Sequence, residues 1–209
     1  MNILFDIGHP AHVHYFKNLI INLKKYGHEI TVVARNREII FELLEYYKIP
    51  FISRGKGSNS IIGKLFYMII ADLIIISTAI KSKSKLFISF SSPYAAQASF
   101  FLNKKHISIN DTEHTDKIHK LFTYRFSKFI LTPKSYLNNL GSKQYRFKNI
   151  MEGFYLNDKV FKPDNSIFND LKIKRNQKFV FIRFVSWDAH HDLGQSGISI
   201  DVIKKIINL

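Results

Sequence analysis

The stretch "NILFDIGHPAHVHYFKNLI" (residues 2–20) decides the fold of this chain. Its first part, "NILFDI" (2–7), is a mainly apolar run with the length of a buried strand. Its last part carries Phe16 and Leu19 at helical spacing and continues to a glycine that ends the helix. Between them, "GHPAHVH" (8–14) holds three histidines within six residues. The chain therefore begins with a strand that leads into a helix through a turn rich in imidazole.

The alternation of strand and helix continues along the first two thirds of the chain. The predicted strands are residues 2–7, 29–35, 49–53, 85–90, 106–110 and 128–132. The predicted helices are residues 12–27, 37–48, 61–81, 92–103 and 112–126. Short apolar strands that alternate with helices indicate an α/β fold with a parallel, doubly wound, Rossmann-like sheet.

The pattern changes after about residue 150, which predicts a domain boundary. We expect a first Rossmann-like domain over 1–150 and an irregular crossover over 151–164. A new strand at 178–185 then starts a second domain of the same kind over 165–209. One strand and one helix cannot bury their apolar faces alone. The second domain is therefore expected to be truncated, with apolar side chains of 178–209 packed poorly or exposed.

Composition excludes several classes of protein. With 209 residues and 46% hydrophobic content, the chain can bury a substantial core. It has no cysteine, which excludes disulfides, thiolate catalysis and cysteine–zinc sites. The formal net charge is +15, but 24 of the 31 basic residues are lysine and no nucleic-acid-binding motif accompanies them. We therefore expect no nucleic-acid partner, and the absence of a signal-peptide pattern favours a cytoplasmic location.

The segment 61–81, "IIGKLFYMIIADLIIISTAIK", is long and apolar enough to raise the question of a membrane span. Lys64 and Asp72 interrupt it, and it lies within the strand–helix series. We expect a buried or membrane-apposed helix. A basic face formed by Lys117, Lys120, Tyr124 and Lys128, together with "KSKSK" (81–85), suggests peripheral docking on an anionic membrane, although a merely solvated face also fits.

Three polar stretches follow predicted strands, which places them at one edge of the sheet. They are "GHPAHVH" (8–14), "FSSPYAAQ" (90–97) and "NDTEHTD" (110–116). Parallel sheets bind ligands at the carboxyl ends of their strands. The histidines of the first turn are thus expected at the binding site of this fold.

The histidines of the first turn allow two kinds of site. Their spacing of i, i+3 and i+5 spans a loop and a helix start, which is weak evidence for a metal site, and we expect no metal. An imidazole can instead act as a general base, and His12 is our candidate. Gly8 and His9 are candidate substrate-binding residues, whereas His14 is expected only to pack on the helix.

The second and third stretches supply candidates of two kinds. Ser92 and Tyr94 are expected to bind substrate. Asp111 and Glu113 are candidate catalytic carboxylates that orient the base or the acceptor, and His114 is a candidate for binding sugar hydroxyls. Asp111 could also simply cap the following helix, where Glu113 would suit the helix dipole.

The stretch "SWDAHHDLGQSG" (186–197) is the richest in functional groups. It holds the only tryptophan and is followed by a helix whose amides could face an anion. An ordinary polar loop is the alternative. The candidate substrate-binding residues here are Ser186, Trp187, Asp188, His190, His191, Asp192, Gly194, Gln195, Ser196 and Gly197.

Together, "ILFDIGHPAHVHYFKNLI" (3–20), "SSPYAAQ" (91–97), "NDTEHT" (110–115) and "RFVSWDAHHDLGQSGIS" (183–199) resemble the DUF354 family. Members of that family look like glycosyltransferases of the GT-B type and like the related UDP-N-acetylglucosamine 2-epimerases. The resemblance covers essentially the whole chain. It implies a first domain that holds the acceptor and a second domain that holds the nucleotide sugar.

A more distant likeness is to the MurG-type N-acetylglucosaminyltransferases, which carry a histidine at the position that His12 occupies. Their polar turn after the fifth strand, here Asn110 to His114, lies near the acceptor. This chain has "GHPAH" in place of their glycine-rich loop, which argues against a lipid-pyrophosphate acceptor. It also lacks the arginine that the 2-epimerases carry in the first loop.

The resemblance predicts a sugar-nucleotide-dependent glycosyltransferase of cell-surface polysaccharide synthesis that needs no metal and no cofactor. Its partners would be a nucleotide-sugar donor and a saccharide or lipid-linked acceptor. A base near the acceptor and amides near the phosphates would supply what transfer requires. The alternatives are a UDP-sugar 2-epimerase-like enzyme and a non-catalytic scaffold that binds nucleotide sugars.

Overall fold

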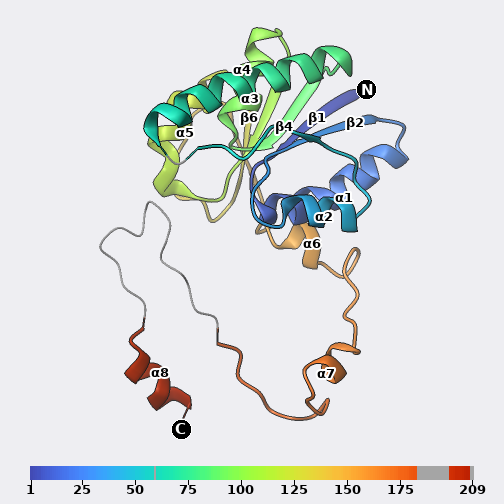
Figure 1. Ribbon diagram of the computed structural model, residues 1–209, viewed down its shortest axis with the longest axis vertical. Helices are drawn as coiled ribbons and strands as arrows, with labels where there is room; N and C mark the ends of the chain where they lie inside the picture. The colour runs from blue at the N-terminus through green and yellow to red at the C-terminus, as the bar shows by residue number, and fades with distance from the viewer. Residues whose placement is uncertain (59, 183–197, 208–209) are drawn as a thin grey trace. The chain divides into compact units, whose positions relative to one another are not determined.

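The computed structural model describes residues 1–58, 60–182 and 198–207 (Figure 1). It divides into two units, Met1–Lys162 and Pro163–Leu209, which are described separately.

The first unit is built on a seven-stranded sheet in the order β3-β2-β1-β4-β5-β6-β7. Every neighbouring pair of strands is parallel, as the sequence predicted. The strands are β1 (Asn2–Ile7), β2 (Glu29–Ala34), β3 (Ile52–Ser53), β4 (Leu86–Phe90), β5 (Lys105–Ile109), β6 (Phe129–Pro133) and β7 (Gln144–Phe147). The fold class is therefore confirmed as α/β and Rossmann-like.

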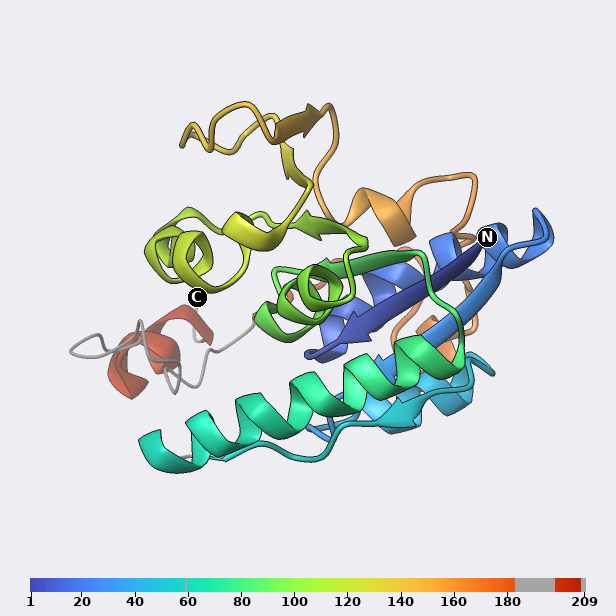
Figure 2. The same cartoon turned by 90° about the horizontal axis from the view of Figure 1, so that it is seen from above.

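Helices cover both faces of the sheet (Figures 1 and 2). One face carries α1 (Pro10–Lys25), α2 (Ile40–Tyr46) and α6 (Gly153–Leu156). The other carries α3 (Ile61–Lys81), α4 (Pro93–Phe101) and α5 (Asp116–Phe122). The short helices η1 (Glu113–Thr115) and η2 (Tyr124–Phe126) flank α5.

Strand β1 shows how the sequence produces the two layers. Ile3, Phe5 and Ile7 join the core beneath α1 and α2, whereas Leu4 joins the core beneath α3 and α4. This alternation follows from the two-residue period of a strand. Asp6 shares the face of Leu4 and is fully buried, so it needs polar partners there.

Two predicted elements differ from the structure. The strand expected at 49–53 is reduced to Ile52–Ser53, because Ile49 N–H bonds Leu44 O at the end of α2 and Pro50 has no N–H to donate. The helix expected at 112–126 is divided into η1, α5 and η2. The sequence reading also missed β7, an edge strand whose exposed Tyr145 and Arg146 interrupt any apolar pattern.

The division of that helix corrects the predicted basic face. Lys117 and Lys120 are exposed on α5 and Lys128 is exposed ahead of β6. Tyr124, however, is only 4% exposed, and its hydroxyl accepts from Asn110 Nδ2 at 2.8 Å. The four residues therefore do not form one helix face.

Helix α3 buries only part of its apolar surface on the sheet side and leaves most of its large apolar residues outside. Ala71, Ile75 and Ala79 are buried. Its exposed large apolar side chains are Ile62, Leu65, Phe66, Ile69, Ile70, Leu73 and Ile80. Within the described residues, Ile62–Lys81 is the one helix long and apolar enough to cross a membrane by length and composition. The expectation of a buried helix is thus wrong, and the membrane-apposed alternative stays a prediction.

The second unit contains α7 (Ile167–Asp170) and α8 (Ile200–Ile207). Residues 178–182 of the predicted strand 178–185 are not in a strand, and the rest of it lies outside the described residues. Phe179, Val180 and Phe181 are mostly exposed, as expected for the described part of 178–209.

Candidate functional site

A pocket of about 270 Å³ lies at the carboxyl ends of β1 and β4, where the sequence placed a binding site. Both strands lead directly into a helix that starts with proline, α1 at Pro10 and α4 at Pro93. The described residues that line the pocket are Gly8, His9, His12, Arg37, Arg54, Phe90, Ser91, Ser92, Pro93 and Tyr94. Two neighbouring strand–helix turns therefore build this site.

The three histidines of the first stretch have distinct structural roles. His9 is the N-cap of α1, and its Nδ1 accepts a hydrogen bond from Ala11 N–H at 3.2 Å. His12 lies one turn further along, where its ring packs 4.8 Å from the Phe90 ring centre. His14 is not among the residues that line the pocket, and its ring contacts those of Tyr47 and Tyr155, as expected of a packing residue.

The environment of His12 keeps its imidazole neutral. Desolvation by burial, then the charges of His9 and Arg54, lower the pKa of His12 to about 3. Gly8 N–H donates to its Nδ1 at 3.3 Å, so the proton of the neutral ring is assigned to Nε2. In this tautomer His12 offers a ligand a hydrogen-bond donor.

The turn between β4 and α4 is held in an uncommon backbone conformation. Ser91 has a φ of 49°, in the left-handed region that non-glycine residues rarely occupy. Its hydroxyl donates to Ile109 O at 3.1 Å, which helps to fix the turn. Ser92 then caps α4 by accepting from Ala95 N–H at 3.3 Å. Such strained positions cluster at functional sites.

A buried ion pair supports the pocket. Arg54 follows β3 and donates through Nε to Asp6 Oδ1 at 2.7 Å, and both side chains are at most 2% exposed. The other oxygen of Asp6 accepts from the Ser92 hydroxyl. Burial opposes the positive charge of Arg54, but the Asp6 carboxylate outweighs it and the pKa of Arg54 is raised. Asp6 therefore ties together β1, the segment after β3 and the start of α4.

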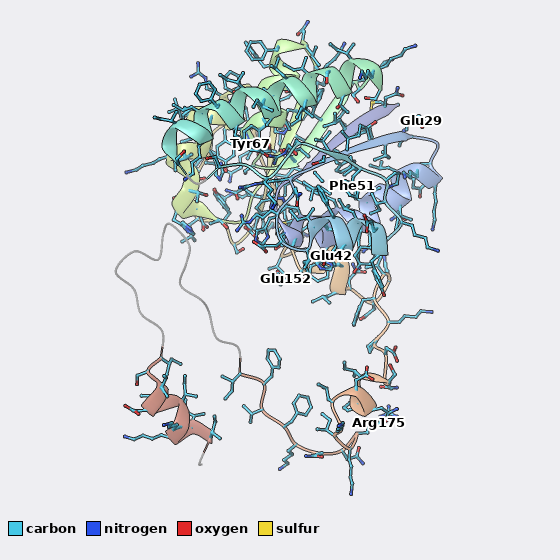
Figure 3. All side chains as sticks on the ribbon, in the orientation of Figure 1. Glu29, Glu42, Phe51, Tyr67, Glu152 and Arg175 are labelled. Carbon is cyan, nitrogen blue, oxygen red and sulfur yellow. The ribbon has the colours of Figure 1, made fainter. Side chains whose placement is uncertain are left out.

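Two tyrosines enclose the guanidinium of Arg54. Tyr67, labelled in Figure 3, accepts from Arg54 Nη1 through its hydroxyl. The Tyr94 ring centre lies 4.6 Å from Arg54 Cζ, a cation–π contact. Asp72 on α3 adds a carboxyl group near the ion pair, and burial together with the Asp6 charge raises the pKa of Asp72 to about 7 despite Arg54. Its Oδ1 is buried and has no hydrogen-bond partner within the part of the chain that the structure describes.

The loop after β5 forms a separate polar cluster beside this pocket. Asp111 accepts from the Thr112 hydroxyl at 2.7 Å and is close enough to help raise the pKa of Tyr15. Glu113 is already engaged, because its Oε1 accepts from Leu137 N–H at 2.9 Å. Neither Asp111 nor Thr112 caps the next helix through its side chain.

The structure brings together five of the residues singled out in the sequence: Gly8, His9, His12, Ser92 and Tyr94. Asp111, Glu113 and His114 do not line the same pocket. The candidates from Ser186 to Gly197 lie outside the described residues. Among the described residues, no group of three or more potential ligands is arranged to hold a metal ion.

Sequence reasoning missed Asp6, Arg54 and Arg37. Asp6 is the only charged residue in "NILFDI", an unusual presence in a buried strand that signals a specific partner. Arg54 follows a strand as the histidine turn does, and so belongs to the same edge of a parallel sheet. Its rarity was a further signal, since the chain has only seven arginines.

Comparison with known proteins places the chain in one family and one fold group. The family described as "Protein of unknown function (DUF354)" matches residues 1–209. The uncharacterized protein MJ0665 of Methanocaldococcus jannaschii is 27% identical over 192 residues, which is 88% of this chain and 56% of that protein.

Solved structures of two kinds share the fold. MurG of Acinetobacter baumannii matches with a TM-score of 0.53 at 13% identity, over 66% of this chain and 43% of its own. The UDP-GlcNAc 2-epimerase of M. jannaschii, in complex with UDP-GlcNAc and UDP, matches with a TM-score of 0.52 at 13% identity, over 64% and 40%. The chain thus spans about half the length of its matches or less, and the likeness is to GT-B enzymes.

Proposed function

The chain belongs to the DUF354 family, and from that premise we propose that it is the acceptor-binding part of a sugar-nucleotide-dependent glycosyltransferase. The observation that carries the proposal is the pocket at the carboxyl ends of β1 and β4. It joins an imidazole, a guanidinium and two helix N-termini on a fold shared with proteins solved with a nucleotide sugar. We propose cell-surface polysaccharide synthesis in the cytoplasm as its setting.

The proposed reaction transfers a sugar from its nucleotide to an acceptor hydroxyl. The acceptor oxygen bonds to the anomeric carbon, the bond from that carbon to the diphosphate breaks and the nucleoside diphosphate leaves, and the proton of the hydroxyl passes to the base. We propose that His12 is the base that acts on the acceptor hydroxyl and that Asp111 orients the acceptor. Glu113 would hold the loop that carries Asp111 through its hydrogen bond with Leu137 N–H. The stretch Ser186 to Gly197 is proposed to bind the donor phosphates, and no metal or other cofactor is required.

The resting geometry sets a condition on His12 as a base. A base at Nε2 needs the ring proton on Nδ1, where the Gly8 N–H now donates. Substrate binding must therefore release this contact before His12 can take the proton. Otherwise His12 serves as a hydrogen-bond donor to the acceptor, and the departing diphosphate takes the proton. His12→Gln separates these roles, because the amide retains a donor but cannot act as a base.

The first test of the proposal uses binding and turnover together. Nucleotide sugars are screened by thermal shift on the whole protein, since a bound ligand raises the melting temperature by mass action. The best donor is then incubated with candidate saccharide and lipid-linked acceptors, and nucleotide release is measured. We expect release that depends on acceptor and falls by at least about a hundredfold in His12→Ala, within the range of general acid–base catalysis.

Three outcomes separate the alternatives. Nucleotide release that requires acceptor supports the transferase. Formation of the epimer from a UDP-sugar without acceptor favours the 2-epimerase. Arg54 supports this alternative, because its guanidinium lies next to Gly8 in the first loop. Binding of nucleotide sugar without any turnover in the wild-type protein favours the scaffold.

We also propose that this protein docks peripherally on an anionic membrane through α3. The exposed apolar residues of this helix recur at spacings of three and four from Ile62 to Leu73, which forms one continuous stripe. Three exposed lysines lie at the end of this helix and just after it: Lys81, Lys83 and Lys85. An apolar stripe with flanking lysines suits a bilayer surface that carries acidic lipids, where lipid-linked acceptors are found.

A further inference from the structure

The pocket at the carboxyl ends of β1 and β4 has an unbalanced charge. None of the described residues that line it is acidic, whereas two of them, Arg37 and Arg54, are basic. The Arg37 guanidinium pairs with Glu38 at 2.7 Å, but both side chains are more than two fifths exposed. Such an exposed pair is weak and exchanges easily with another anion.

Of the two arginines in the pocket lining, Arg54 is the one whose guanidinium is held in place. It is 2% exposed, Nε bonds Asp6 and Nη1 bonds Tyr67. The third nitrogen, Nη2, has no hydrogen-bond partner among the described residues and lies 3.2 Å from where a Cβ of Gly8 would stand. A buried guanidinium that lines the pocket and has an unused donor is prepared for an oxygen ligand.

Two helices add to this positive potential. The N-caps of α1 and α4, His9 and Ser92, both line the pocket, so the N-termini of a 16-residue and a 9-residue helix meet there. The N-terminus of a helix carries about half a positive charge and favours anions. These two dipoles act on the same space that Arg54 Nη2 borders.

We propose that this pocket binds an anionic group of the acceptor, a phosphate or a carboxylate, between Arg54 and the first turns of α1 and α4. This proposal rests on the proposed function in one respect only, namely that the anionic group is assigned to the acceptor. The pocket volume of about 270 Å³ is below the usual range for whole ligands, about 300 Å³ or more, and suits the charged group with at most one sugar ring. The acceptor is thus a sugar phosphate, a lipid-linked phosphate or an acidic sugar.

The test measures binding of inorganic phosphate and glucuronate to the whole protein by calorimetry, with glucose as the neutral control. We expect at least one anion to bind and glucose to bind more weakly. The stronger anion identifies the source of the charge. If neither anion binds better than glucose, the proposal is overturned.

Variants locate the binding site. Arg54→Met is made together with Asp6→Asn so that no charge is left buried and unpaired. Gly8→Ala places a methyl group against Nη2 and leaves the ion pair in place. We expect each to weaken anion binding about tenfold or more, the typical worth of a charge-assisted hydrogen bond. Arg125→Gln, a change to an exposed arginine outside the pocket lining, is the matched control and should bind as the wild type does.

Folding is checked by thermal unfolding of every variant, and Gly8→Ala keeps the test decisive if the double variant does not fold. Anion binding that survives Gly8→Ala and Arg37→Gln together overturns the proposal. So does UDP binding that the same variants weaken equally, because the pocket would then hold the donor. Anion binding without any sugar transfer leaves this inference standing and refutes the proposed function alone.

Discussion

Single polar residues, each buried in an apolar setting, define the chemistry of the first unit. Asp6 receives hydrogen bonds from Arg54 and Ser92 and so fixes the position of a guanidinium at the pocket. His106, with no exposed surface, lies between the hydroxyls of Ser89 and Ser127 at 2.9 Å each. Removing one partner of a buried ion pair such as Asp6–Arg54 typically costs about 3–5 kcal/mol, because the other charge is left unpaired.

The buried histidines make stability depend on pH. Burial lowers the pKa of His12 and of His106 to about 3, below the unfolded value of about 6.5. The unfolded chain therefore binds more protons between these values, and the free energy of unfolding falls as the pH drops from about 6.5 towards 3. Each histidine contributes a slope of up to about 1.4 kcal/mol per pH unit.

Urea unfolding of the wild type and of His106→Gln between pH 5 and 8 measures this slope. The glutamine also retains hydrogen-bonding groups for the two serines. We expect the wild type to lose more stability than His106→Gln on acidification from pH 6.5, and parallel curves would contradict the lowered pKa. Comparing the two slopes also removes the opposite effect of Asp72, whose raised pKa is common to both proteins.

At the scale of the element, periodicity predicted the long helices and central strands well. The range 61–81 matches α3, and the strand at 2–7 matches β1, because long regular segments repeat their signal many times. The short edge strands β3 and β7 gave no such signal. The helix predicted at 112–126 is divided because Thr123 turns to donate its hydroxyl to Ser91 O, a tertiary contact that no local pattern reveals.

The membrane proposal is tested on α3. Phe66→Ser with Ile69→Ser removes two of its exposed apolar side chains, which are 65% and 57% exposed, and should leave the fold intact. We expect binding to vesicles of phosphatidylglycerol and phosphatidylcholine to weaken about tenfold or more, given the transfer free energy of two such side chains. Co-sedimentation at low and raised salt measures it.

Tyr26→Ser, which changes an 81% exposed residue at the end of α1, is the matched control and should bind vesicles as the wild type does. Wild-type binding should weaken with salt and with the loss of acidic lipid, because the lysines contribute. Equal affinity for neutral and anionic vesicles, or none for either, would refute anionic membrane docking.

At the scale of the whole molecule, the sequence predicted a parallel sheet and the edge at which the pocket lies, because alternating strands and helices indicate parallel strands whose carboxyl ends meet at one edge. It could not predict Arg54 as a pocket residue. Residues 6, 54 and 92 are far apart in the chain, and the pairing of β1 with β2 and β4, together with that of β2 with β3, brings them together. In the described chain, every buried hydrophobic residue lies at or before Met151.

That distribution of buried residues predicts that the first unit folds without the second. A chain of residues 1–162 keeps both hydrophobic cores and all seven strands. We expect its circular dichroism to show the same α/β signature and its thermal unfolding to remain cooperative, with a midpoint within a few degrees of the full chain. A broad transition without cooperativity would show that residues after 162 support the sheet.

The central place of β1 has a consequence for synthesis on the ribosome. Strand β1 can pair with β2 once residue 34 has been made, but its second neighbour, β4, is complete only once residue 90 has been made. The two hydrogen-bond partners of Asp6 are also made later, Arg54 before β4 and Ser92 just after it. The nascent chain therefore carries an unpaired carboxylate within its first apolar strand, which opposes premature burial of that strand. We therefore expect the residues that shape the pocket also to delay burial of β1 until β4 is available to pair with it.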